Sequence, residues 1–293
     1  MRAGAVPDFP IIDSHIHLAD PGRLSYPWMA EVPALNRVVL PADLKRAAAP
    51  VEIEGLVFVE VDAAAGAEVA EAEWIDGLTT RQPSGEPKIR GAVASLPLEL
   101  GPDAIRADLD RLLQLKSFRG VRRLIQGQAD PEFCTRPDFV AAVQLLGQRD
   151  VPFDICIYER QLPAAIRLVE ACPDVRFVLD HIAKPRIRDG LMEPWRTNLV
   201  ALARHENVWC KISGVATEAD HRNWTAGELR PYIAHAIDVF GFERVMFGGD
   251  WHVAELAIRY PRWVEIVDGV VASATADEKH RLYRDNAIGF YRL

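Results

Sequence analysis

Eight short apolar runs recur along the chain, separated by segments in which apolar residues follow a helical period. Most runs are nearly continuous rather than alternating, which is typical of parallel strands covered on both faces. The predicted strands are Ile11 to His17, Gly55 to Val61, Ile89 to Ser95, Gly120 to Ile125, Pro152 to Tyr158, Val175 to His181, Val208 to Ser213 and Arg244 to Asp250. The helical segments include Pro41 to Ala49, Ala64 to Leu78, Asp103 to Leu115, Pro137 to Gln148, Leu162 to Ala171, Pro194 to His205 and Gly227 to Phe240. This order predicts a closed (β/α)₈ barrel of the TIM type, with an open doubly wound sheet as the alternative.

No repeat, low-complexity tract or linker divides the sequence, so we expect one barrel domain over residues 1–293. The stretch from Ala19 to Leu40 is the one long connection, and its three prolines and one glycine predict a structured loop. Loops that follow barrel strands form the active-site face. We therefore expect Tyr26, Trp28 and Met29 to cover or line a pocket, with a surface-packed aromatic cluster as the alternative.

Composition narrows the class of protein. Hydrophobic residues make up 49% and charged residues 26%, which is typical of a soluble globular protein, and the net charge of -8 argues against partners such as nucleic acid or an anionic membrane surface. No apolar run approaches the roughly 20 residues that span a bilayer, and Met1 to Pro10 lacks the apolar core of a secretory signal. The four cysteines form no CxxC pair, and Cys156 and Cys210 lie in apolar runs. We expect buried, reduced thiols and a cytoplasmic location.

The chemistry-bearing residues cluster at the ends of predicted strands. His15 and His17 alternate with Ile16, so both imidazoles point to the same side of the first strand. Two neutral imidazoles on one face suit a divalent metal ion or the polarisation of a carbonyl oxygen. His181 ends the sixth run and Asp250 the eighth. A carboxylate at a barrel mouth opposite histidines is a candidate general base for activating water, with a helix N-cap as the alternative.

Charged residues also lie within the strands. Arg122 and Arg123 fall in the fourth run, where an arginine is costly unless it is paired, so at least one should face the pocket or a carboxylate. The other charged residues at strand positions are Glu60, Asp154 and Lys211, and Lys184 follows the sixth strand. Each is a candidate either for the site or for a structural ion pair.

Four motifs together resemble a known family. They are Asp13-Ser14-His15-Ile16-His17, Gly120-Val121-Arg122, Leu179-Asp180-His181 with Lys184-Pro185, and Gly249-Asp250-Trp251. Their order and strand-end placement resemble the amidohydrolase-related lactonases over nearly the whole chain. That group includes fuconolactonase, rhamnonolactonase and pyrone-dicarboxylate lactonase, and the overall pattern is most similar to an L-fuconolactonase.

The resemblance implies hydrolysis of a cyclic ester, with a sugar lactone as the small-molecule partner. It places His15, His17 and His181 around the reacting carbonyl and makes Asp250 the group that activates water. The expected substrate-binding residues are Arg122, Arg123, Lys184, Trp28, Glu60, Tyr158 and Trp251.

Two departures from the pattern of metal-dependent amidohydrolases limit the number of metal ions that we expect the site to hold. The fifth run has no histidine and the fourth has no lysine for a carbamate bridge. We therefore expect either no required metal or a single divalent ion such as Zn²⁺ at His15, His17 and Asp250. His252 stands where relatives often carry proline, and its role is left open. So are the sugar, the lactone ring size and a homo-oligomeric state. The alternative functions are a mononuclear-zinc decarboxylase and a non-catalytic ligand-binding barrel.

Overall fold

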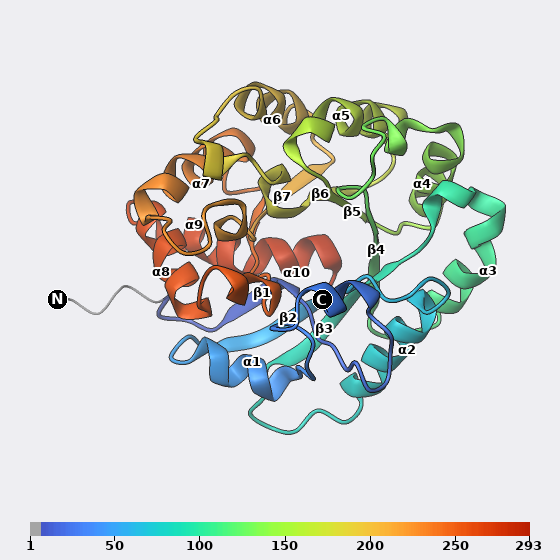
Figure 1. Cartoon of the computed structure of the whole chain (residues 1–293), viewed down its shortest axis with the longest axis horizontal. Helices are drawn as coiled ribbons and strands as arrows, with labels where there is room; N and C mark the ends of the chain where they lie inside the picture. Colours follow the sequence, from blue (N-terminus) through green and yellow to red (C-terminus); the bar gives the residue numbers. More distant parts are fainter. Residues whose placement is uncertain (1–6) are drawn as a thin grey trace.

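The computed structural model describes residues 7–293 and shows eight parallel strands arranged in sequence order around one ring (Figure 1). The strands are β1 (Ile11–Ile16), β2 (Ile53–Val59), β3 (Lys88–Ser95), β4 (Phe118–Leu124), β5 (Phe153–Cys156), β6 (Phe177–Leu179), β7 (Val208–Ile212) and β8 (Val245–Phe247). The first six residues of the segment considered above as a secretory signal lie outside this description.

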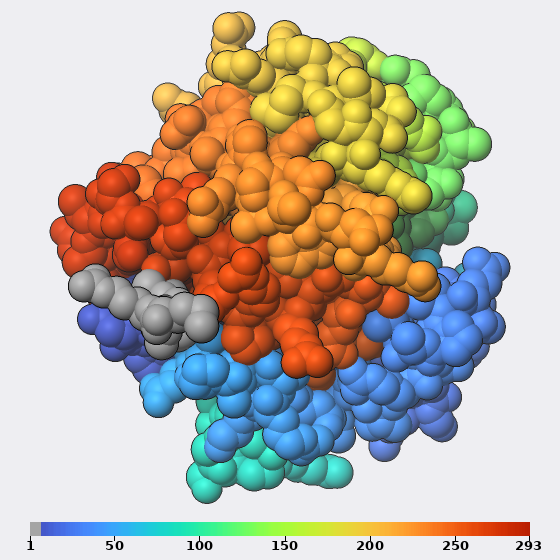
Figure 2. All heavy atoms as spheres, turned by 60° about the vertical axis from the view of Figure 1, so that its left-hand side comes forward, coloured from blue at the N-terminus to red at the C-terminus, as the bar shows by residue number. Residues whose placement is uncertain are grey.

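The ring closes between its first and last strands. Ile16 pairs in parallel with Trp251, the His17 amide donates to the Trp251 carbonyl at 2.6 Å, and the Asp250 amide donates to the His15 carbonyl at 2.9 Å. In the space-filling view the blue N-terminal residues pack directly against the orange C-terminal part (Figure 2). The predicted closed (β/α)₈ barrel is therefore confirmed, and the open sheet is excluded.

A ring of helices surrounds the strands. These are α1 (Pro41–Ala48), α2 (Glu68–Thr79), α3 (Pro102–Leu112), α4 (Pro137–Gln148), α5 (Leu162–Ala171), α6 (Trp195–Ala203), α7 (Ala226–Phe240), α8 (Tyr260–Val270) and α9 (Ala276–His280), with α10 (Asn286–Tyr291) near the end of the chain. Prolines in the first turn begin α1, α3, α4, α5 and α8, where the missing amide proton costs no hydrogen bond. Capping boxes at Thr225 and Thr275 begin α7 and α9.

The last helix, α10, lies inside the helix ring, against the interior of the barrel (Figure 1). Phe290 and Tyr291 pack with interior side chains such as Val93 and Met246. The Tyr291 hydroxyl donates to the Asp154 carboxylate at 2.7 Å. The Phe290 ring contacts that of Trp209 at the start of β7, so α10 closes the amino-terminal end of the barrel. The carboxyl-terminal end of the strands is left for the loops.

Strand β6 is shorter than predicted because the chain leaves it through a left-handed turn. His181, Ile182, Ala183 and Lys184 have φ values of 53°, 50°, 63° and 48°. Each non-glycine residue in this conformation costs roughly 1–2 kcal/mol, and the turn is held by burial of Ile182 and Ala183. The Trp195 indole donates to the Ile182 carbonyl at 2.7 Å. This turn places the side chains of His181 and Lys184 at the barrel mouth.

Two further observations concern the described residues. None of the helices in residues 7–293 has the length and apolar character needed to cross a membrane. Cys134, Cys156, Cys172 and Cys210 are all free and buried.

Candidate active site

A cavity of about 330 Å³ opens at the carboxyl-terminal ends of the strands. That volume is in the range of small-molecule sites. Its lining comes from the ends of seven strands and the loops that follow them, which is the face where barrel enzymes hold their chemistry. The lining residues are His17, Trp28, Val61, Asp62, Arg122, Leu124, Gln126, Cys156, His181, Lys184, Thr217, Glu218, His221, Asp250, Val253 and Leu256.

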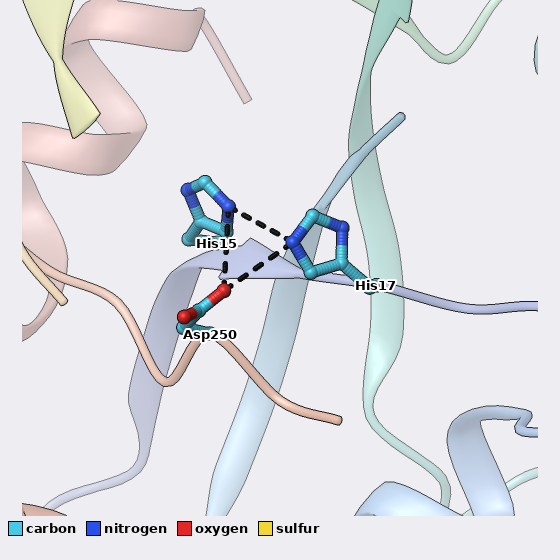
Figure 3. A group of neighbouring side chains, drawn as sticks. All are labelled: His15, His17 and Asp250. Atoms are coloured by element: carbon cyan, nitrogen blue, oxygen red, sulfur yellow. Dashed lines mark hydrogen bonds and ion pairs between the residues drawn. The ribbon is translucent and has the colours of Figure 1, made fainter. Parts of the chain in front are cut away.

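Three of the predicted groups converge at the floor of this cavity (Figure 3). The Nε2 atoms of His15 and His17 are 3.2 Å apart, and Asp250 Oδ1 lies 3.3 Å from His17 Nε2 and 3.8 Å from His15 Nε2. All three side chains are at least 95% buried. The alternation of residues in β1 and the sharp turn at Asp250, where φ is 51°, bring the groups together.

The buried Asp13 carboxylate braces the two chain segments that carry these groups. It accepts the His15 amide at 2.9 Å, the Gly249 amide at 2.9 Å and the Tyr260 hydroxyl at 2.6 Å. A Cβ atom on Gly249 would lie 2.5 Å from Asp13 Oδ2, so glycine is required for this close approach. Asp13 therefore joins the end of β1 to the turn that presents Asp250.

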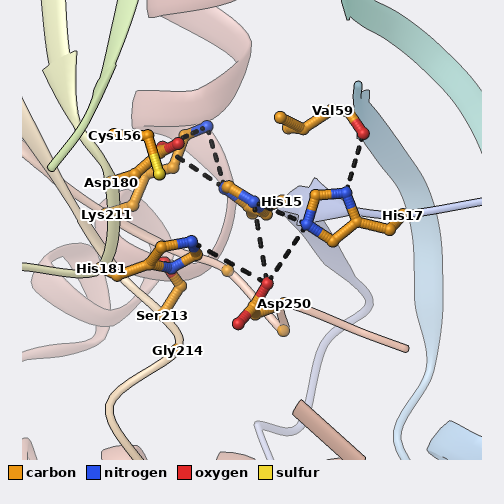
Figure 4. A network of polar contacts seen from close by, with 12 residues as sticks. His15, His17, Val59, Cys156, Asp180, His181, Lys211, Ser213, Gly214 and Asp250 are labelled. Carbon is orange, nitrogen blue, oxygen red and sulfur yellow. Dashed lines mark hydrogen bonds and ion pairs between the residues drawn. The ribbon is translucent and has the colours of Figure 1, made fainter. Parts of the chain in front are cut away.

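His181 approaches Asp250 from the opposite side, with its Nε2 atom 3.9 Å from Oδ1 (Figure 4). Its Nδ1 atom lies 2.8 Å from the Ser213 hydroxyl. Gly214 has a φ of 58°, and a Cβ atom there would sit 2.5 Å from His181 Nδ1 and 2.9 Å from Asp250 Oδ2. The Ser213-Gly214 segment after β7 therefore holds the imidazole in place, a role that the sequence pattern did not indicate.

The pKa shifts of these groups keep Asp250 ionised beside neutral imidazoles. Burial alone would raise the pKa of Asp250, but the neighbouring imidazoles of His181, His17 and His15 hold it well below its ordinary value. Burial lowers the pKa of His15 well below its ordinary value, against the opposing charge of Asp180. It also lowers the pKa of His181 to about 4. At neutral pH the site therefore combines a carboxylate with at least two uncharged rings.

Below this floor lies a buried network of charged groups (Figure 4). Arg122 donates to the Glu60 carboxylate and to the Glu60 carbonyl, both at 2.6 Å, and pairs with Asp180 at 3.3 Å. Lys211 donates to Asp154 at 2.6 Å and lies 3.1 Å from Asp180. Arg122 and Lys211 are thus both paired with carboxylates, and of these two Arg122 also reaches the cavity wall.

His15, His17 and Asp250 fit a single divalent ion. Their three ligand atoms lie 3.2 to 3.8 Å apart, and a tetrahedral zinc site with bonds of ~2.0–2.1 Å separates its ligands by roughly 3.3 Å. His17 Nδ1 lies 2.8 Å from the Val59 carbonyl, which fixes its proton there and turns the lone pair of Nε2 toward the centre. His15, Asp180 and His181 form a second group of candidate ligands, although Asp180 is already paired with Lys211 and Arg122.

The outer half of the cavity holds Lys184 together with polar groups that the sequence pattern did not single out. Lys184 Nζ lies 3.9 Å from Glu218 Oε1. His221, on the same loop as Glu218, binds the Thr217 carbonyl at 2.9 Å. The Cys156 thiol donates to the Gln126 side chain at 3.4 Å. Loops after β4 and β7 supply Gln126, Glu218 and His221, where no apolar period marks them.

The remaining predicted substrate-binding residues occupy different places. Trp28 lines the cavity, and its indole donates to the Val61 carbonyl at 2.8 Å. Arg123 points to the other face of β4 and pairs with Glu99. Trp251 is buried and donates to Glu255 at 2.9 Å. Tyr158 lies beyond the cavity, with Lys184 Nζ 5.6 Å from its ring centre.

Comparisons with known proteins agree with this architecture. A family model described as Amidohydrolase matches residues 12–293. The protein y4mH of Sinorhizobium fredii, which is uncharacterised, is 28% identical over 98% of this chain and 99% of its own length. An L-fucono-1,5-lactonase of Burkholderia ambifaria is 34% identical over 64% of this chain and 66% of its own length. A crystal structure of an amidohydrolase from Burkholderia multivorans with bound zinc is 29% identical and superposes with a TM-score of 0.85, covering 97% of this chain and 100% of that one.

Proposed function

Because the chain belongs to the amidohydrolase family, we propose that it is a lactonase that opens the ring of an uncharged sugar lactone with water. One observation carries the proposal: the Asp250 carboxylate faces the imidazoles of His15, His17 and His181 at the floor of a buried cavity. Ester hydrolysis needs a base for water and donors for the oxyanion, and these four groups are suited to supply both.

In the proposed reaction Asp250 takes a proton from water as the oxygen bonds to the lactone carbonyl carbon. The imidazoles of His15 and His181 donate hydrogen bonds to the carbonyl oxygen as its negative charge develops. When the ring C–O bond breaks, the proton on Asp250 passes to the departing ring oxygen, which becomes a hydroxyl group. Asp250 is then ready for the next cycle. The product is a sugar acid, which releases its carboxyl proton to the solvent and becomes the carboxylate. A divalent ion on His15, His17 and Asp250, when bound, would polarise the carbonyl.

The charges around the cavity favour an uncharged substrate. Asp62, Glu218 and Asp250 line it together with two cations, Arg122 and Lys184. Both cations have partners, since Arg122 is bound by Glu60 and Asp180 and Lys184 faces Glu218. A lactone that carries a carboxylate would therefore find no unpaired cation among the lining residues described. Hydroxyl groups, by contrast, can both donate to Glu218 and accept from Lys184.

The apolar side chains in the cavity wall favour a deoxy-sugar. Trp28, Val61, Leu124, Val253 and Leu256 give part of the cavity an apolar lining that suits a methyl group. Two relatives named L-fucono-1,5-lactonase, at 34% and 35% identity, support L-fucono-lactone or a similar 6-deoxy lactone as the substrate, and a role in L-fucose catabolism. The free, buried cysteines support a cytoplasmic location.

The test is a pH-indicator assay of the purified protein on a panel of aldonolactones, with and without a chelator. We expect acid release from 6-deoxy lactones and a much slower reaction with a lactone that carries a carboxylate. Acid release from none of the lactones would refute the proposal. Ligand binding without turnover would then favour the non-catalytic alternative, and CO₂ release from an aromatic acid would favour the decarboxylase, although β5 supplies no histidine for its zinc.

A further inference from the structure

The Nδ1 atom of His15 has both a hydrogen-bond donor and an acceptor within reach (Figure 4). Lys211 Nζ lies at 3.3 Å and Asp180 Oδ1 at 3.4 Å. A neutral imidazole carries one proton, so Nδ1 can accept from Lys211 or donate to Asp180, but it cannot do both. The choice fixes what the opposite ring atom, Nε2, presents at the floor of the cavity.

The structure favours acceptance from Lys211 when no metal is bound. Lys211 is fully buried between two carboxylates, those of Asp154 and Asp180, and its ammonium group forms an ion pair with each of them. The ammonium group has three protons, and Asp154 Oδ2, Asp180 Oδ1 and His15 Nδ1 lie 2.6, 3.1 and 3.3 Å away. A proton on Nδ1 would face this cation. The Nε2 atom also lies 3.4 Å from a cation, Arg122 Nη1, but that group donates to Asp180, and Nε2 faces two acceptors, His17 Nε2 at 3.2 Å and Asp250 Oδ1 at 3.8 Å. The proton of His15 therefore belongs on Nε2.

The neighbouring ring completes the same pattern. His17 keeps its proton on Nδ1, because that atom faces the Val59 carbonyl at 2.8 Å. Its Nε2 atom then has a lone pair 3.2 Å from His15 Nε2. Hydrogen bonds consequently run in one direction, from Lys211 to His15, from His15 to His17, and from His17 to Val59.

Asp180 can accept a hydrogen bond from the other tautomer of His15, in which the proton is on Nδ1. Its Oδ1 atom is buried and forms an ion pair with Lys211 Nζ at 3.1 Å, but among residues 7–293 no hydrogen bond of good geometry reaches it. If the His15 proton moves to Nδ1, that oxygen can accept it, and Nε2 then offers a lone pair beside that of His17. A carboxylate behind a histidine is the usual partner in metal sites, whereas an ammonium group favours the wrong tautomer for binding a metal.

We propose that Lys211 and Asp180 give His15 two working tautomers, and that Lys211 is the positioning residue that selects the metal-free one. In that form His15 presents an N–H that can donate to a substrate oxygen. In the other form its Nε2 can bind a divalent ion. This inference rests on the proposed function and names Lys211 as the residue that allows the group of His15, His17 and Asp250 to act with or without a metal ion. Its test requires no turnover of substrate.

The direct test is long-range ¹H–¹⁵N NMR of the chelator-treated wild-type protein with ¹⁵N-labelled histidine, assigned with the His15→Asn and His17→Asn variants. We expect His15 to carry its proton on Nε2 and His17 on Nδ1. Adding Zn²⁺ should move the His15 proton to Nδ1 and leave His17 unchanged, so His17 serves as an internal control. A metal-free His15 protonated on Nδ1, or on both nitrogens, would overturn the inference even if lactones are hydrolysed.

A pair of variants isolates Lys211. Lys211→Met combined with Asp154→Asn removes the ammonium group together with one of its two carboxylates, so no additional buried charge is left unpaired. We expect metal-free His15 to shift to the Nδ1-protonated form and Zn²⁺ to bind about 10- to 100-fold more tightly. Asp154→Asn alone keeps Lys211 and should leave the His15 tautomer unchanged. If the double variant folds with the wild-type tautomer and zinc affinity, Lys211 does not select the tautomer.

Discussion

Replacing Asp250 by asparagine gives the most direct test of the proposed chemistry. The amide has nearly the same size and can still accept hydrogen bonds, but it cannot take a proton from water. General-base catalysis is typically worth about 10² to 10⁴ in rate. This corresponds to roughly 2.7 to 5.5 kcal/mol of transition-state stabilisation. We therefore expect kcat to fall by at least about 10²-fold with little change in KM.

Asp62→Asn is the matched control, because Asp62 also lines the cavity but is not among the groups gathered at its floor. It makes the same chemical change and should leave kcat within a few-fold of wild type. Thermal melts of both variants show whether the fold is retained. The reasoning would be refuted if Asp250→Asn kept near-native kcat while His181→Asn abolished it, because the base would then be the histidine.

The pH dependence gives an independent check on the same base. The pKa of Asp250 is held well below its ordinary value, after the opposing effect of burial, and burial lowers that of His181 to about 4. Lowering the pH should therefore protonate His181 before Asp250. We expect kcat/KM to stay level from neutral pH down to about pH 5 and to fall only as the pH approaches 4. A fall centred near pH 6.5, the ordinary pKa of histidine, would contradict the neutral state assigned to the buried imidazole.

Three further predictions follow from other parts of the site. Gly214→Ala should lower kcat by about 10²-fold, because its Cβ would lie 2.5 Å from His181 Nδ1 and displace the ring. Wild-type kinetics in the folded variant would contradict this prediction and show that the ring has room to move. Arg122→Met should reduce the free energy of unfolding in urea by about 3–5 kcal/mol, because it leaves Glu60 buried without its partner; normal stability with a raised KM would instead favour the direct substrate contact predicted from the sequence. Burial is the main reason that the pKa of His252 is lowered to about 4, so on acidification this residue gains its proton in the unfolded protein before it does so in the folded one. The free energy of unfolding should therefore fall by up to about 3 kcal/mol as the pH drops from 6.5 to 4. In His252→Gln this part of the fall, measured by urea unfolding at both pH values, should be absent.

Much of the barrel could be predicted because its strands are buried on both faces. Their near-continuous apolar runs stand out from the helical segments, and the count of eight favours a closed ring. The spacing of His15 and His17 was equally informative, since the alternation of a strand places both side chains on one face. Asp250 could be identified from its position at a strand end.

The partners of these groups could not be predicted in the same way. Asp154 and Lys211 meet across the inside of the ring, and nothing local in either strand indicates that they form a pair. Glu218 lies in a loop without apolar periodicity. The placement of Trp251 depends on the backbone leaving the extended conformation at Asp250, and the sequence around this residue carries no signal for its positive φ.

The left-handed turn after β6 has a consequence for how specificity can diverge. His181 and Lys184 are carried on one short, buried segment, so the spacing between the ring at the reacting centre and the cation at the polar end of the cavity is nearly invariant. Few substitutions would be tolerated in four successive residues of this conformation. Relatives that adapt to larger or smaller lactones should therefore differ at Trp28, Leu124 or Leu256 on the facing walls, while the turn stays the same.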